Sequence, residues 1–151
     1  MKDPLNKAII IAAKTHRGKK GRNREPALLH PLRVMSMMND NNSRIAAILH
    51  DVVESRKITI KDLQDKGFND NILIAVDLLS KRKGEEYIHY INRLKGNKIA
   101  LKVKLADLID NYIRRKKHKV LSKNDKQKIK KYKKAYTVLT GQTLKSAIKH
   151  L

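Results

Sequence analysis

The sequence predicts an all-α protein folded as a single domain, and three observations lead to this prediction. Apolar residues recur at helical spacing along most of the chain. No alternating run of apolar and polar residues is long enough to indicate a β-strand. The chain has 151 residues and no cysteine, so it can bury a core of its own and has no disulfide framework or thiolate metal site.

Polar loops divide the first part of the chain into helices. A helix is expected over residues 4–16, with cations near its end that suit the helix dipole. The loop GKKGRNREP, residues 18–26, contains two glycines, a proline and four basic residues that could hold phosphates or simply face solvent. A second helix is expected over residues 27–38. Its start is marked by His30-Pro31, because proline is tolerated in a first turn.

Helical patterns continue to the end of the chain. Asn41 to Ser43 are expected to cap the third helix, and Thr59 has capping-box spacing before a helix that ends at Gly67. Further helices are expected over residues 70–79, 85–94 and 99–115, followed by one long or two shorter basic helices over residues 121–151. We therefore predict one domain over residues 1–151, with a motif-bearing core at about 5–115 and basic C-terminal helices at about 121–151.

The net charge is the most unusual property of the composition. Lysine and arginine number 36 against 14 acidic residues, which gives a net charge of +22. This charge favours a polyanion such as nucleic acid or a small multiphosphate ligand, although a lysine-rich solvated surface would also account for it. Only Tyr132 and Tyr136 interrupt the C-terminal basic run, which weakens a single-strand binding hypothesis. The first apolar run, residues 8–13, is too short to span a membrane and follows no signal-peptide pattern, so a cytoplasmic location is expected.

The stretch ILHDVVES, residues 48–55, places polar groups on an otherwise apolar helix. At about 100° per residue, His50 and Glu54 share one side of the helix and Asp51 lies beside them. A helix that is apolar nearly all round is buried, and buried charges are costly unless they are paired or bind a metal. The alternative is an acidic helix end in ordinary solvent.

Two other helices supply compatible residues. His30 has apolar neighbours and so lies near the core, where a hydrogen-bonded histidine is the alternative to a metal ligand. Asp107 is flanked by apolar residues, with Asn111 one turn later and Lys104 one turn earlier, although Lys104 and Asp107 could form only a surface ion pair. The candidate metal ligands are two imidazoles and two carboxylates on three predicted helices: His30, His50, Asp51 and Asp107.

This ligand set predicts metal-assisted phosphoryl chemistry. Nitrogen and oxygen ligands suit manganese, iron or zinc, and such an ion would acidify a water and polarise the phosphorus that it attacks. Glu54 could orient that water or remove its proton, and Asn111 could hold the water or a phosphate oxygen.

Three segments carry a resemblance to a known family: HPLRV at residues 30–34, LHDVVES at 49–55 and VKLADLIDN at 103–111. They resemble the signatures of the HD-domain superfamily, and more narrowly those of the RelA/SpoT hydrolase domain and the stand-alone small alarmone hydrolases. The resemblance runs from near Ala12 to about Asn111, and the C-terminal helices agree only in type.

The resemblance implies an HD-domain helical bundle with Mn²⁺ that hydrolyses the 3′-pyrophosphate of guanosine tetra- or pentaphosphate. The products would be pyrophosphate and GDP or GTP. It also implies that Glu54 acts on the nucleophilic water, that Asn111 contributes beside it, and that the metal ligands are His30, His50, Asp51 and Asp107.

The chain departs from the family pattern at two places. Ser55 stands where the family usually has a second acid, and residues 25–28 read Glu-Pro-Ala-Leu where the family reads roughly Thr-Pro-Tyr-Ile. Either change could lower activity or alter the nucleotide accepted. The expected substrate contacts are Lys20, Arg22, Lys104 and Ser55. Because 151 residues leave no space for a synthetase domain, a hydrolase alone is expected.

Two alternatives remain at this level. One is an HD phosphohydrolase that acts on another nucleotide, as the altered loop and Ser55 suggest. The other is a degenerate HD module that binds nucleotide or nucleic acid through its positive charge, against which the four intact ligand positions argue. The sequence predicts no particular oligomeric state.

Overall fold

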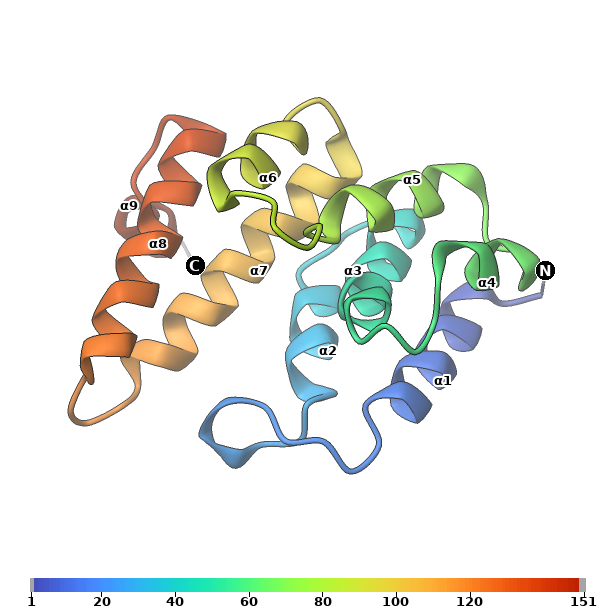
Figure 1. The fold of residues 1–151 in the computed structure, drawn as a ribbon, viewed down its shortest axis with the longest axis horizontal. Helices are drawn as coiled ribbons and strands as arrows, with labels where there is room; N and C mark the ends of the chain where they lie inside the picture. Colours follow the sequence, from blue (N-terminus) through green and yellow to red (C-terminus); the bar gives the residue numbers. More distant parts are fainter. Residues whose placement is uncertain (1, 150–151) are drawn as a thin grey trace.

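The computed structural model describes residues 2–149, and within this range the chain is helical (Figure 1). The described part contains no β-strand, only an isolated bridge between Lys20 and Pro26. The all-α prediction is therefore confirmed. The elements are α1 (Pro4–Thr15), η1 (Arg22–Arg24), α2 (Leu29–Ser36), α3 (Asn41–Glu54), α4 (Ile60–Asp65), α5 (Asp70–Leu79), α6 (Tyr87–Arg93), α7 (Lys98–Lys116), α8 (Lys123–Thr140) and α9 (Leu144–Ile148).

Helix α3 lies at the centre of the bundle and contacts α1, α2, α5 and α7 (Figure 1). Its buried side chains cover most of its circumference, as the apolar pattern predicts. The cap differs from the expected Asn41 to Ser43. Asp40 is the N-cap, because its extended backbone lets the carboxylate accept the N–H of Ser43 at 2.8 Å.

Helices α6, α7 and α8 form the other side of the molecule. Helix α7 packs against α2, α3 and α5 and also against α8, which turns back along it (Figure 1). The buried face of α8 includes Ile129, Tyr132 and Tyr136, which recur at helical spacing. Gly141 ends α8 with a φ of +73°, a conformation that glycine adopts without steric cost, so the C-terminal segment forms two helices rather than one.

One cluster of buried apolar side chains draws on all the α-helices of the described range. The assignment of residues 1–151 to one domain, with a motif-bearing core and basic C-terminal helices, stays a prediction. The second helix begins at Leu29, one residue before the start that His30-Pro31 marks and two residues after the beginning of the expected range 27–38. The reason is that the Ala27 N–H bonds to the Lys19 carbonyl at 3.0 Å, which ties this segment to the preceding loop. No helix within residues 2–149 has the length and apolar character needed to cross a membrane.

An ion pair in the α5–α6 connection gives a pH-dependent prediction. The hydrogen bond from Arg93 and the N–H of Arg82 lower the pKa of Glu85 to about 2. Because the pKa of Glu85 is lower in the folded state, the ionised group stabilises the fold at pH values above its ordinary pKa near 4.5. This contribution is lost as the pH falls towards 2. Glu85→Gln should therefore lower the thermal unfolding temperature at pH 7, and the difference from wild type should shrink between pH 5 and pH 2.

Thermal unfolding of both proteins at pH 7, 5, 4 and 3 measures this difference. Glu86→Gln is the matched control, because the neighbouring Glu86 side chain is 73% exposed. A difference between Glu85→Gln and wild type that stays constant over this range would contradict the assignment.

Candidate metal centre

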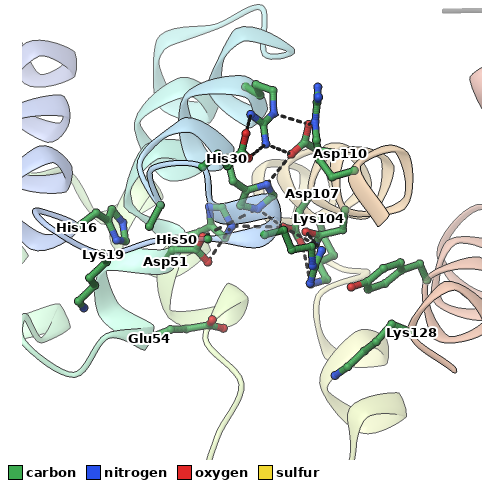
Figure 2. Close-up of a pocket in the computed structure, with 18 of the residues that line it drawn as sticks. His16, Lys19, His30, His50, Asp51, Glu54, Lys104, Asp107, Asp110 and Lys128 are labelled. Atoms are coloured by element: carbon green, nitrogen blue, oxygen red, sulfur yellow. Dashed lines mark hydrogen bonds and ion pairs between the residues drawn. The ribbon is translucent and has the colours of Figure 1, made fainter. Parts of the chain in front are cut away.

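Three of the four predicted metal ligands place their ligand atoms around a common point. Nε2 of His30, on α2, lies 2.8 Å from Oδ1 of Asp107, on α7, and Nε2 of His50, on α3, lies 3.5 Å from the same oxygen. The three atoms all lie within 4.8 Å of one another. Asp51 lies beside them, with Oδ1 3.1 Å from His50 Nε2 and Oδ2 3.9 Å from His30 Nε2 (Figure 2).

The spacing and chemistry of these groups fit a divalent transition ion. A cation bound at about 2.1 Å from nitrogen and oxygen atoms brings neighbouring ligand atoms to about 3 Å from one another. The buried Nε2 of His50 has no hydrogen-bond partner within the described residues, although two carboxylate oxygens lie close to it. A buried nitrogen without a partner, next to carboxylates, can be satisfied by a cation.

The other ring nitrogens orient both histidines for this role. His50 Nδ1 lies 2.5 Å from the carbonyl oxygen of Ala47, and His30 Nδ1 lies 2.7 Å from Oδ2 of Asp110. A carbonyl and an ionised carboxylate can only accept, so Nδ1 donates in both rings. In each neutral imidazole the lone pair is then on Nε2, which faces the cluster.

The electrostatics of the cluster favour an added positive charge. Burial lowers the pKa of His30, but hydrogen bonds to Asp107 and Asp110 outweigh it and raise that pKa to about 10. Burial also lowers the pKa of His50, and the charges of Asp51 and Asp107 raise it to about 9. These carboxylates therefore provide negative charge that protons neutralise when no metal is bound.

Lys104 lies inside the site rather than in a surface ion pair. Its Nζ lies 2.8 Å from Oδ2 of Asp107, and the side chains of the two residues are 12% and 7% exposed. Burial alone would raise the pKa of Asp107, but the positive charge of Lys104 and the two histidines hold it well below its usual range. The alternative that Lys104 and Asp107 form only a surface ion pair is wrong, because other elements cover this part of α7. The centre of the Tyr90 ring, on α6, lies 5.2 Å from Nζ.

A pocket of about 550 Å³ opens above the cluster. Figure 2 shows Glu54 on one side of this pocket and Lys128 on the other, with the cluster between them. The basic loop contributes Lys19 and Arg22, and α8 contributes Lys131 as well as Lys128. The pocket therefore combines acidic groups at the cluster with cations on two further walls, an arrangement that suits a polyanionic ligand.

The predicted catalytic residues both line this pocket. Partial desolvation at the pocket wall, together with the charge of Asp51, raises the pKa of Glu54. The Asn111 side chain bridges two parts of the site: its Oδ1 accepts from Arg22 Nη1 at 2.8 Å, and its Nδ2 donates to Asp107 Oδ1 at 3.2 Å.

Three of the four predicted substrate contacts line the pocket: Arg22, Lys104 and Ser55. The fourth, Lys20, is not a lining residue, although its neighbour Lys19 is. The Ser55 hydroxyl donates to the Val52 carbonyl at 2.5 Å, so it is held by the end of α3.

Sequence reasoning missed several residues of the site. Asp110 carries a signal that could have revealed it, because it is a second acid one turn after Asp107 in the same apolar pattern. Lys19 belongs to the basic loop that was expected to be able to hold phosphates, although Lys20 was named there instead. No local signal indicates the others, which come from the end of α1, from α2, from α6 and from α8. The missed residues that line the pocket include His16, Lys19, Arg33, Tyr87, Tyr90, Asp110, Lys128, Lys131 and Tyr132.

The fold and this cluster define an HD-domain helical bundle, in which a histidine, a His-Asp pair and a distant aspartate come together from three helices. A solved structure described as a metazoan ortholog of SpoT that hydrolyses ppGpp and plays a role in starvation responses has the same fold. It matches with a TM-score of 0.75 and 21% identity, over 95% of this chain and 89% of that one.

Curated relatives come from the RelA/SpoT group of proteins. A GTP pyrophosphokinase of Streptomyces coelicolor is 27% identical over 75% of this chain and 15% of its own length. A guanosine-3′,5′-bis(diphosphate) 3′-pyrophosphohydrolase of Vibrio cholerae is 32% identical over 52% of this chain, and a GTP pyrophosphokinase of Myxococcus xanthus is 31% identical over the same share. The chain spans only 12% and 11% of the length of these two. No protein-family profile matches the chain. The resemblance to RelA/SpoT proteins is confirmed by these similarities.

Proposed function

We propose that this chain is a Mn²⁺-dependent hydrolase that removes the 3′-pyrophosphate of guanosine tetra- or pentaphosphate in the cytoplasm. The observation that supports it most is the cluster of His30, His50, Asp51 and Asp107 beneath a pocket with cationic walls. Similarity to a 3′-pyrophosphohydrolase of this nucleotide, and a shared fold with a SpoT ortholog that hydrolyses ppGpp, support the choice of substrate.

The four cluster residues would hold the cation. When bound, a divalent ion supplies Lewis acidity that lowers the pKa of water and polarises the phosphoryl group. The reaction joins the oxygen of one water to the phosphorus next to the ribose, breaks the bond from that phosphorus to the 3′ oxygen and returns a proton to the 3′ oxygen. Pyrophosphate and GDP or GTP are the products.

Glu54 is proposed to remove the proton from the attacking water. A general base works best when its pKa lies near the working pH, and both desolvation and Asp51 move the pKa of Glu54 upward in that direction. Asn111 would position rather than exchange protons, because its amide is already fixed between Arg22 and Asp107.

The cations of the pocket are proposed to hold the phosphates of the nucleotide. Arg22 can form paired hydrogen bonds with phosphate oxygens while its guanidinium lies 5.7 Å from the ring centre of Tyr132. Lys128 and Lys131 add positive charge on the α8 side, and Lys104 adds it beside the cluster. These charges would attract the substrate and offset the repulsion between its phosphates.

Incubation of the purified protein with guanosine tetraphosphate and Mn²⁺, with metal content measured in the same sample, tests this proposal. Stoichiometric release of pyrophosphate and GDP is expected. No release from protein with metal bound would rule the proposal out. Turnover confined to nucleotides without a 3′-pyrophosphate would instead identify a phosphohydrolase for another nucleotide. Strongly salt-dependent binding of RNA or DNA with no turnover would identify a binding module.

Introducing an acid at Ser55 should raise the turnover number. Ser55→Asp restores the carboxylate usual in the resembling family, next to Glu54 and at the pocket wall, and we expect kcat to rise about tenfold. Ser55 is the C-cap of α3, where a negative charge is unfavourable by about 0.3–1 kcal/mol, so a small loss of stability should accompany the gain. Ser55→Asn is the control of similar size. Equal kcat values for the two variants and wild type would show that the missing acid does not limit the rate.

A further inference from the structure

A partly buried charge network lies behind His30, on the side of the ring opposite the candidate metal centre. Oδ2 of Asp110 accepts from His30 Nδ1 at 2.7 Å, and the Asp110 side chain is 1% exposed (Figure 2). Arg33 donates to both oxygens of this carboxylate, from Nε at 2.8 Å and from Nη2 at 3.1 Å. Arg114, one turn later on α7, adds a longer contact from Nε to Oδ1 at 3.5 Å. The carboxylate is thus held by His30 and by two arginines, and it faces only one nitrogen of the ring.

We propose that Asp110 is a positioning residue for His30, and that it holds the ring in the tautomer and orientation that turn Nε2 towards the cation. The inference rests on the metal centre of the proposed function. Arg33 keeps the Asp110 carboxylate ionised and in place, and it acts on His30 only through that carboxylate.

The position of His30 in its helix explains why it needs such a residue. His50 lies deep in α3, so its Nδ1 donates to a carbonyl of its own helix, that of Ala47. His30 is the second residue of α2, where no earlier helical turn offers a carbonyl. The acceptor must therefore come from elsewhere in the fold, and Asp110 on α7 supplies it.

The network also connects the metal centre to the basic loop. Glu25, at the end of the loop, accepts from Arg33 Nη2 at 2.6 Å and from Nη1 at 3.2 Å. The Glu25 carbonyl accepts from the Gly21 N–H at 2.8 Å, which closes the loop around Arg22. Glu25, Arg33 and Asp110 thus place the loop and the His30 ligand relative to one another.

Metal affinity measured without substrate tests the inference. Calorimetric titration with Mn²⁺ should give a dissociation constant about 10- to 100-fold higher for Asp110→Ala than for wild type, as is usual when a residue that supports a histidine ligand is lost. Asp110→Asn keeps an oxygen that can accept from Nδ1, so it should recover part of the affinity. Asp65→Asn, which removes a carboxylate from an exposed ion pair on α4, should bind as wild type does.

Nitrogen chemical shifts of the Zn²⁺-loaded protein provide a readout that a purely structural role would not change. In wild type, His30 should carry its proton on Nδ1, and in Asp110→Ala this proton should exchange faster while the circular dichroism spectrum is retained. Unchanged Mn²⁺ affinity in Asp110→Ala, or a wild-type His30 without a proton on Nδ1, would overturn the inference.

These outcomes separate the inference from the proposed function. A wild-type protein that binds Mn²⁺ without releasing pyrophosphate, together with weaker binding by Asp110→Ala, would disprove the proposed function and support the inference. Pyrophosphate release by wild type, together with equal Mn²⁺ affinity in wild type and Asp110→Ala, would support the proposed function and disprove the inference. Absence of Mn²⁺ binding by wild type would overturn both.

Discussion

Asp107→Ala is expected to abolish Mn²⁺ binding and, with it, turnover. The Oδ1 atom of Asp107 lies 2.8 Å from Nε2 of His30 and 3.5 Å from Nε2 of His50, so its loss removes an oxygen that faces both rings. It also leaves the buried ammonium of Lys104 without its partner, which should lower the free energy of unfolding by about 3–5 kcal/mol. Metal analysis and thermal unfolding of the purified variant measure the two effects.

A double variant separates loss of the ligand from loss of stability. Lys104→Met combined with Asp107→Ala removes both charges of the buried pair, so it should recover much of the unfolding free energy. Metal binding should stay absent, because the ligand is still missing. A stable double variant that binds Mn²⁺ as wild type does would show that Asp107 is not a ligand.

Glu54→Gln is expected to keep the metal and lose most of the turnover. The amide has the size of the carboxylate but cannot accept the proton of the attacking water, and general-base catalysis typically contributes about 10²- to 10⁴-fold to the rate. Because the Glu54 carboxylate forms no hydrogen bond or ion pair within the described residues, stability should change little. Single-turnover kinetics with Mn²⁺ at saturation, together with metal analysis, measure the effect.

A matched control for Glu54 is Glu86→Gln, which neutralises an acid that is 73% exposed and not among the pocket residues. Its turnover should equal that of wild type. If Glu54→Gln also turned over at the wild-type rate, Glu54 would have no part in the mechanism, and another pocket group would have to accept the proton.

Local patterns predicted most of the helices because their causes are local. The apolar spacing of α5 gave its bounds, residues 70–79, and Thr59 and Asp62 form the predicted capping box at the start of α4. The errors occur at the first residues of two helices, where another residue takes the cap or a loop holds the preceding chain. Asp40 takes the cap of α3, and the loop bond to Ala27 delays α2.

The supporting residues of the site were not predictable in the same way. Asp110 follows Asp107 by one turn in the same apolar pattern, but its partner Arg33 is 77 residues away and looks like an ordinary charged residue on its own helix. Lys104 looks like half of a surface pair until other helices cover it. The α8 wall of the pocket is similar: its lysines follow a basic surface pattern, and packing against α7 brings Lys128 and Lys131 to the pocket.

By itself, the sequence determined the helical class, the burial of α3 and the identity and order of the candidate ligands His30, His50, Asp51 and Asp107. Only the tertiary structure decided that these side chains meet, which nitrogen of each histidine faces the cluster, and which cations share the pocket. The physical reason is that periodicity and caps depend on residues a few positions apart. The meeting of side chains from α2, α3 and α7 depends on how the whole core packs.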